Sequence, residues 1–249
     1  ISDMGDMISL KQYQLANYFV EDAETTSLNQ NIINQISSSD VSQIMQLVNQ
    51  ITIEPHSRYS ILEQLGSLDL SNEQLSIIST GILKLIVKSH MNGFIFNTNP
   101  ELPMWGSIGY SVRVLKVNQY DFSFYNPFEY TYQINIEQAG LTSLNFTLTG
   151  VPFVDVYDVI VEDKVNVPRD TIYFENEDLD EFTPSVIIED TPTETTYLLL
   201  LEEGADGNIY YINRTVTDVF GTTTQYKIYE EQYRSESRIY DRFIVDKEG

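Results

Sequence analysis

The chain has 249 residues, of which 42% are hydrophobic and 12% aromatic, so it can bury a sizeable core and wholesale disorder is not expected. Its 37 acidic residues outnumber its 14 lysines and arginines, which gives a formal net charge of −23. A negative field of that size repels phosphate backbones and anionic lipid surfaces. The composition therefore argues against nucleic-acid binding and favours either cationic partners or simply a need for solubility.

The chain contains no cysteine, which excludes disulfides, thiolate nucleophiles and cysteine-ligated metals. Its longest apolar stretch, residues 81–87, is interrupted by Lys84, so we expect no transmembrane span. Because the sequence begins at Ile1, we expect that an upstream segment has been removed, and such a segment could tether the protein to a membrane.

The first third of the sequence predicts helices. Apolar residues recur at helical spacing over residues 7–36 and again over 41–51, with Ser39 or Asp40 as the N-cap of the second run. After a turn at Pro55, residues 56–66 predict only a short strand or turn. A third helix is expected over residues 71–90, with Ser71 or Asn72 as its N-cap.

After residue 92 the apolar period changes to two, which predicts strands. The aromatic stretch at residues 119–140 raises a choice between a ligand platform and the core of a sheet. Phe122 and Phe124 share one face, and Asn126-Pro127 predicts a turn before the strand at 131–138. We interpret this layout as a β-meander, whose aromatic residues are core and cross-strand pairs.

The remaining strands are expected over most of the C-terminal part. Asp206-Gly207 is a hairpin signal, which predicts a turn between strands at residues 196–202 and 208–217. The fold class is therefore α+β, with N-terminal helices packed on an antiparallel sheet, followed by an elongated all-β module. The expected domains are residues 1–152 and 153–249. The expected strands lie at residues 93–99, 109–117, 121–126, 131–138, 143–150, 153–162, 171–174, 185–189, 196–202, 208–217, 224–231 and 238–245.

The candidate chemical groups have simpler explanations. We interpret His56 as a surface turn residue, and His90 as a cation at the C-terminus of the third helix, where it would interact with the helix dipole. The acidic run at residues 175–181 could bind Ca²⁺, but it lacks the spacing of an EF-hand loop, so a solvated loop is favoured. We expect no catalytic residue, metal site or cofactor.

Three aromatic residues are the candidate binding residues. Trp105 is the only tryptophan, and it could stack on a sugar or a peptide, or equally fill the seam between helix and sheet. Tyr125 and Tyr130 belong to the aromatic stretch, and exposed tyrosines on strands suit contacts with glycans or proteins.

Five stretches, taken in their order along the chain, carry a resemblance to a known family. The strongest is "DFSFYNPFEYTYQINIEQAGLTSLNFTLTG" at residues 121–150. The other four are "LANYFVEDAETTSLNQNIINQI", "LVNQITIEPHSRYSILEQLG", "NEQLSIISTGILKLIVKSHMNGFIF" and "LLLLEEGADGNIYYINRTVTDVFGTTTQYKIYEEQYRS". Together they resemble the VanW-like domain of Gram-positive cell-envelope proteins, followed by a G5-like β-module.

One departure from the family pattern bears on function. When Ser79-Thr80 is aligned with the family's Ser/Thr pair, Leu75 stands where the family has cysteine, and Ser76 stands where it has glutamine. Chemistry that depends on that cysteine is therefore excluded here. The resemblance implies an extracellular location in the cell envelope of a Gram-positive-type bacterium more than it implies a reaction.

We therefore expect a non-enzymatic binding or scaffolding module that contacts peptidoglycan, another cell-wall polymer or an envelope protein. One alternative is an enzyme that processes wall glycan or peptide through carboxylate or Ser/His chemistry. It requires a cleft in which Ser76, Ser79 or Thr80 lies near His56 or an acid. A second alternative is an acidic structural or assembly component of the cell surface.

Overall fold

The computed structural model describes residues 26–175 and 187–246, apart from the side chains of residues 163 and 164. The fold is α+β and mostly β, as the sequence predicts. The helix expected at residues 7–25 lies outside the described residues. Within the described ranges no helix is long and apolar enough to cross a membrane.

Two compact units divide the chain, and each is described by itself. Unit 1 comprises the chain up to Glu162 together with Tyr211–Glu231, and unit 2 comprises Asp163–Tyr210 and the chain from Gln232 onwards. The boundaries therefore fall inside three strands that form one sheet in the order β10-β14-β15. These strands are β10 (Val156–Val167), β14 (Gly207–Thr217) and β15 (Thr223–Tyr233). The expected division at residue 152 stays a prediction.

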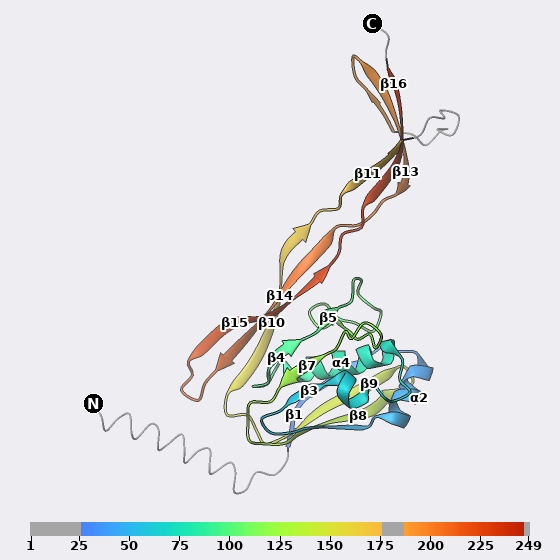
Figure 1. The fold of residues 1–249 in the computed structure, drawn as a ribbon. Helices are drawn as coiled ribbons and strands as arrows, with labels where there is room; N and C mark the ends of the chain where they lie inside the picture. Colours follow the sequence, from blue (N-terminus) through green and yellow to red (C-terminus); the bar gives the residue numbers. More distant parts are fainter. Residues whose placement is uncertain (1–25, 176–186, 247–249) are drawn as a thin grey trace, which may run out of the picture. The chain divides into compact units, whose positions relative to one another are not determined.

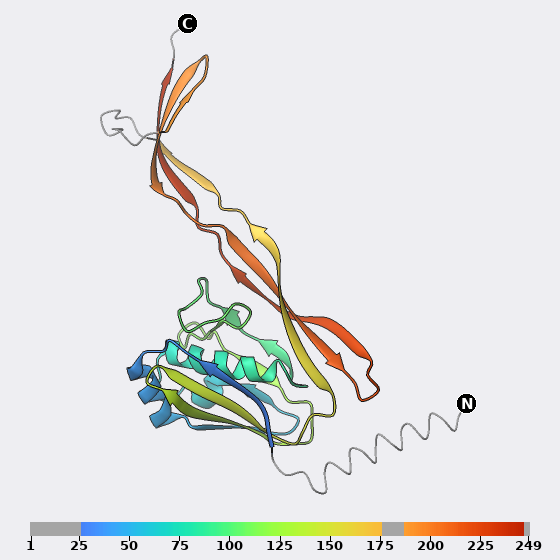
Figure 2. The same cartoon turned by 180° about the vertical axis from the view of Figure 1, so that it is seen from behind.

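Unit 1 is built on a four-stranded antiparallel sheet in the order β1-β9-β8-β2 (Figure 1). Helix α4 crosses one face of this sheet over β1 and β9, as the view from behind shows (Figure 2). Besides its parts of β10, β14 and β15, unit 1 also contains two short helices and two smaller sheets. The elements are β1 (Thr26–Ile33), α2 (Ser38–Leu47), β2 (Gln50–Ile53), β3 (Arg58–Ser60), α3 (Ile61–Leu65), α4 (Asn72–Ile86), β4 (Asn92–Ile95), β5 (Asn97–Thr98), β6 (Val112–Arg113), β7 (Ser123–Tyr125), β8 (Tyr132–Gly140) and β9 (Ser143–Gly150).

Helix α4 begins and packs for identifiable reasons. Ser71 and Gln74 form a capping box, in which each side chain accepts a hydrogen bond from the other residue's backbone N–H. Twelve of the fifteen residues of α4 are buried. At Gly81 a Cβ atom would lie 2.5 Å from the ring of Phe146 on β9, so glycine is required where the helix approaches the sheet most closely. The core therefore lies between α4 and the apolar face of the sheet.

The helix predicted up to residue 36 is wrong, because β1 occupies residues up to Ile33. On β1 the inward-facing Asn31 donates through Nδ2 to the carbonyl of Gly81 at 2.9 Å, and Asn29 donates to the carbonyl of Leu85 at 3.1 Å. These amides donate hydrogen bonds to carbonyls of α4 from a neighbouring strand. The contacts with α4 and the sheet therefore outweigh the helical spacing of the apolar residues in this segment. The next helix is present, but its N-cap is Ser37 rather than Ser39 or Asp40.

Two further predictions in unit 1 need correction. Residues 61–65 form the helix α3, capped by Ser60, where only a strand or turn was expected. The predicted β-meander is also wrong, because β7 pairs with β3 and β4 in a separate sheet, whereas β8 pairs with β9 and β2. The core role is confirmed for Phe122, Phe124 and Tyr132, which are buried, and the ring centroids of Phe122 and Phe124 lie 5.6 Å apart. It is wrong for Tyr120 and Phe128, which remain 36% and 40% exposed.

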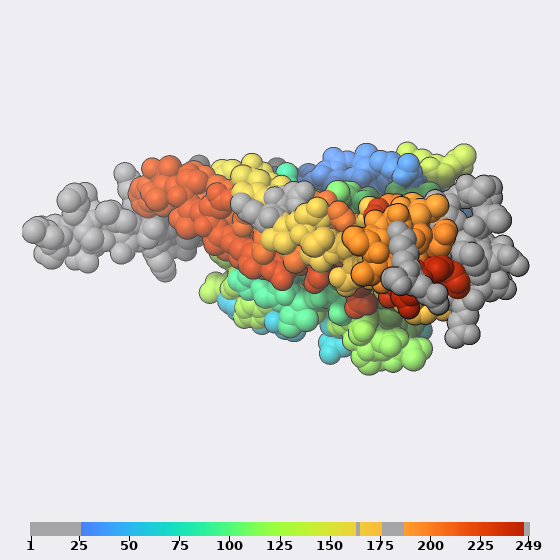
Figure 3. Space-filling model, turned by 90° about the horizontal axis from the view of Figure 1, so that it is seen from above, coloured from blue at the N-terminus to red at the C-terminus, as the bar shows by residue number. Residues whose placement is uncertain are grey.

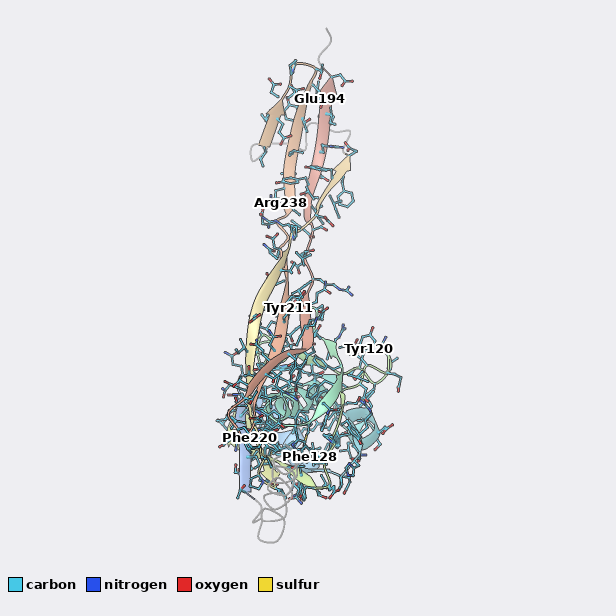
Figure 4. The ribbon with its side chains drawn as sticks, turned by 90° about the vertical axis from the view of Figure 1, so that its left-hand side faces the viewer. Tyr120, Phe128, Glu194, Tyr211, Phe220 and Arg238 are labelled. Atoms are coloured by element: carbon cyan, nitrogen blue, oxygen red, sulfur yellow. The ribbon has the colours of Figure 1, made fainter. Side chains whose placement is uncertain are left out.

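Unit 2 contains a four-stranded sheet in the order β11-β16-β13-β12. Glu194 and Arg238, which are labelled in Figure 4, lie at opposite ends of this sheet. In Figure 3 the residues near 190–202 are coloured orange and lie at the surface. Its strands β11 and β16 are parallel, and the other pairs are antiparallel. The strands are β11 (Thr171–Glu175), β12 (Ile187–Asp190), β13 (Glu194–Glu202) and β16 (Arg238–Asp246).

Three short segments of unit 2, residues 168–170, 203–206 and 234–237, lie together, and we call them the crossing segments. Ala205 and Glu236 exchange two backbone hydrogen bonds, and the N–H of Arg238 donates to the carbonyl of Asp170. A Cβ atom on Gly204 would lie 2.4 Å from the carbonyl oxygen of Glu236. The predicted hairpin turn is wrong, because β13 and β14 belong to different sheets. Gly204 instead allows the backbone of its segment to lie close to that of Glu236.

Candidate functional site

A pocket of about 360 Å³ in unit 1 is lined mainly by aromatic side chains, and we call it the aromatic pocket. Its volume is within the range of small-molecule sites, roughly 300–1,000 Å³. The lining comes from the turns around residues 56 and 90, the segment 127–132 and the segment 151–157. The lining groups that bear on recognition are His56, His90, Phe128, Glu129, Tyr130, Tyr132, Phe153, Asp155 and Tyr157.

The rings of the pocket contact one another around His90. The centroid of its imidazole lies 3.9 Å from that of Phe128, 5.1 Å from that of Tyr132 and 4.9 Å from that of Phe153. Phe128 itself remains 40% exposed and lies at one end of unit 1 in Figure 4. The pocket therefore has a packed aromatic base and at least one ring that solvent and a ligand can reach.

A buried amide fixes this arrangement. Asn126 donates through Nδ2 to the carbonyls of Glu54 and Tyr130, and its Oδ1 accepts from the N–H of Phe128. Because Oδ1 is thereby the acceptor, the contact of 3.2 Å with His90 requires a proton on Nε2 of the imidazole. The amide thus selects the tautomer of His90 and holds the segment that carries Phe128 and Tyr130.

His90 is not the cation that the sequence predicts at the end of α4. The helix ends at Ile86, and burial lowers the pKa of His90 to about 4, opposed by its hydrogen bond to Asn126 and assisted by the charge of Arg214. The imidazole is therefore neutral at pH 7. Its role is to pack in the aromatic pocket and to hydrogen-bond with Asn126.

Arg214 of β14 supplies the charge at that helix end. Its guanidinium donates to the carbonyls of Val87 and Met91 at 2.9 Å each and, more weakly, to that of Ile86. The side chain is 1% exposed, and burial lowers its pKa. Sequence periodicity could not have found this contact, because it joins residues more than 120 positions apart.

His56 is an exposed turn residue with a backbone φ of 48°, as expected for a turn. Its N–H donates to the carbonyl of Phe128 at 3.1 Å, so this turn holds the rim of the aromatic pocket. The sequence contains two histidines, and both line this pocket. No sequence pattern reveals that they share a pocket, because each is linked to it through the segment at 126–130.

The three predicted binding residues lie in different places. Tyr130 lines the aromatic pocket and is half-buried. Trp105 is 7% exposed, its indole donates to Glu73 at 3.1 Å, and it borders a separate pocket of about 250 Å³. Tyr125 lies on β7 beside Arg58 and Asn92. Their roles in binding stay predictions, and only Tyr130 belongs to the aromatic pocket.

The hydroxyls that a Ser/His enzyme would need have structural partners. Ser79 donates to the carbonyl of Leu75, and Ser76 donates to that of Asn72 while accepting from the N–H of Val114. Thr80 accepts from the N–H of Val112. All three are buried, as is Leu75 at the position of the family's cysteine. These side chains pack α4 against its surroundings.

Metal-binding groups do not gather in the part of the chain that the structure describes, where no cluster of three or more acidic or histidine side chains could hold an ion. Residues 177–181 of the acidic run lie outside the described residues. Glu175, the first residue of the run, forms an ion pair with Arg242.

Neither a family model, nor a curated protein, nor a solved structure matches this chain. The resemblance to VanW-like and G5-like proteins therefore stays a prediction. What the aromatic pocket can bind has to be inferred from its own geometry.

Proposed function

We propose that this chain is a non-enzymatic binding or scaffolding protein of the extracellular cell envelope, in contact with peptidoglycan or with an envelope protein. Its ligand site is the aromatic pocket of unit 1. The observation that carries the proposal is a preformed pocket with accessible rings and polar groups, in a unit whose candidate nucleophiles are all held in structural hydrogen bonds. The envelope location is supported by the resemblance alone.

The geometry of the pocket supports recognition rather than turnover. Aromatic faces give a ligand large contact area at small cost in side-chain entropy, and Glu129 and Asp155 offer acceptors at the same site. The buried titratable side chains of its lining are His90 and Tyr132, and the hydrogen bond of His90 to Asn126 is structural.

The test is co-sedimentation of the whole chain with purified cell wall, together with cross-linking to extracted envelope proteins. The wild type should be retained on one of these partners, and Tyr130→Leu should weaken that retention by removing a ring and a hydroxyl from the pocket. Glu137→Gln on β8 is the matched control, because Glu137 is exposed and does not line the pocket. The proposal fails if the wild type finds no partner in either assay, or if it releases products from wall fragments.

A further inference from the structure

We infer that the group bound in the aromatic pocket is an organic cation, an alkylammonium carried by a polymer or a protein. The inference rests on the proposed function, because it names the chemistry recognised at the same site. Two properties of the pocket carry it: the faces of its rings, and the sign of the charges that line it.

The aromatic lining is the first property. Phe128, Tyr130, Tyr132 and Phe153 contribute four rings to a pocket that a small head group could enter. The face of an aromatic ring carries negative potential and attracts ammonium groups, most strongly when water is excluded. Unit 1 already uses this interaction internally, since the guanidinium of Arg214 lies 5.4 Å from the ring of Phe94 and 5.8 Å from that of Tyr157.

The charge of the lining is the second property. Glu129 and Asp155 line the pocket, and no lysine or arginine does so among the described residues. His90 adds no positive charge at pH 7, because burial keeps it neutral. Arg214 is the nearby cation, but it is almost fully buried and its donors face three backbone carbonyls. A bound ammonium would therefore meet two carboxylates and aromatic faces.

Other ligand classes fit these groups less well. An anion would find no lysine or arginine in the described lining and would enter the field of a protein with a net charge of −23. A neutral apolar group would desolvate Glu129 and Asp155 without compensating them. An ammonium with alkyl substituents uses both features, because its alkyl surface contacts the rings while its charge pairs with the carboxylates.

The experiment compares choline with 3,3-dimethylbutan-1-ol, its uncharged carbon isostere, by calorimetric titration and by NMR of the whole chain. The two ligands have the same shape, so a difference in affinity measures the charge alone. Choline should bind at least about tenfold more tightly than the isostere and should shift the signals of Tyr130 and Phe153. Equal affinities, or choline shifts away from the pocket, would overturn the inference.

Two variants separate the ring from the carboxylate. Tyr130→Leu keeps an apolar side chain without a ring, and Asp155→Asn keeps the shape of the side chain without its charge. Each should weaken choline binding by about tenfold and leave isostere binding nearly unchanged. The control Glu137→Gln removes an exposed carboxylate elsewhere in unit 1 and should bind choline like the wild type. Loss of choline binding in this control would show that net charge, rather than the pocket, attracts the cation.

A third arm identifies the source of the ammonium. Nα-acetyl-lysine methylamide represents a protein side chain, whereas choline represents a quaternary head group, and the tighter of the two assigns the source. The outcomes also separate this inference from the proposed function. If the chain is retained on the wall while both cations bind no better than the neutral isostere, the cation inference fails and the proposed function stands. If choline binds but no wall or envelope partner is retained, the proposed function fails instead.

Discussion

In unit 1, Phe146 of β9 lies fully buried beneath α4, whereas in unit 2 the aromatic ring of Phe243 on β16 remains half-exposed. Among the described residues of unit 2, only Leu198 and Tyr240 are buried apolar residues, while unit 1 buries apolar residues from most of its elements. The difference shows two ways of stabilising strands: burial against a helix, and hydrogen bonds with ion pairs between neighbouring strands.

The sharpest test of this comparison is the removal of one ring from each unit. Phe146→Ala should destabilise unit 1 by about 4 kcal/mol, because a rigid core retains most of the cavity that the ring leaves. Phe243→Ala should lower the free energy of unfolding by only about 1 kcal/mol, because folding removes only part of this ring from water. Urea unfolding measures the first effect by the fluorescence of Trp105, the single tryptophan, which lies in unit 1.

Hydrogen exchange of peptides from β13 and β16 measures the effect of Phe243→Ala within unit 2. The comparison breaks down if the two substitutions have equal cost, because unit 2 would then bury its rings as deeply as unit 1 does.

A second prediction concerns arginines. Arg214→Met should destabilise unit 1 by about 3 kcal/mol, because the carbonyls of Val87 and Met91 lose charged donors while remaining buried. Urea unfolding followed by Trp105 fluorescence measures this loss. Arg242→Met is the matched substitution in unit 2, where an exposed ion pair with Glu175 is removed, and its effect should be much smaller. A stable Arg214→Met variant would show that other donors serve the end of α4.

A third prediction uses the low pKa of His90. Its value of about 4 in the folded state lies below the ordinary 6.5, so between these pH values the unfolded chain binds the proton and the folded chain does not. The free energy of unfolding therefore falls as the pH drops from 6.5 to 4, by about 3 kcal/mol from this residue. His90→Gln should lose less stability over that interval than the wild type. Unfolding curves at pH 7, 5.5 and 4 measure the difference, and parallel pH profiles would contradict the assignment.

The sequence predicts local features of both units well, where neighbouring residues determine them. The N-cap at Ser71, one of two expected, and the buried Phe122 and Phe124 follow from patterns within one segment. The wrong predictions concern segments whose structure is determined by contacts with residues far away in the sequence. Asn31 faces α4 from β1, and no helical or strand period reveals a hydrogen bond to Gly81.

The same limit applies to the candidate site. Tyr130 could be proposed from its aromatic neighbourhood, but the pocket exists because Asn126 joins the segments of Glu54, His90 and Tyr130. An asparagine before a proline reads as a turn signal, and here the turn is also the centre of a buried hydrogen-bond network. The partners of such a residue become known only when the fold brings them together.

The smallest expected effect concerns the crossing segments of unit 2. Glu203 accepts from both Arg169 and Arg238, so one carboxylate joins two of the three segments to the start of β16. Glu203→Gln keeps the size of the side chain and removes its charge. Hydrogen exchange of peptides covering residues 203–206 and 234–238 should become modestly faster in the variant, because exposed ion pairs contribute little each.

The dependence of hydrogen exchange on salt concentration shows whether the effect of Glu203→Gln is electrostatic. Raising the ionic strength screens exposed pairs, so the exchange rates of wild type and Glu203→Gln should converge between low salt and 0.5 M salt, an interval over which the Debye length falls below about 10 Å. In peptides from α4 the exchange rates of the two proteins should show no salt-dependent difference, because that helix is stabilised by burial and by Arg214. Glu137→Gln in unit 1 controls for net charge. A difference that persists at high salt would mean that Glu203 acts through geometry, and the two units would then differ less than their exposed surfaces suggest.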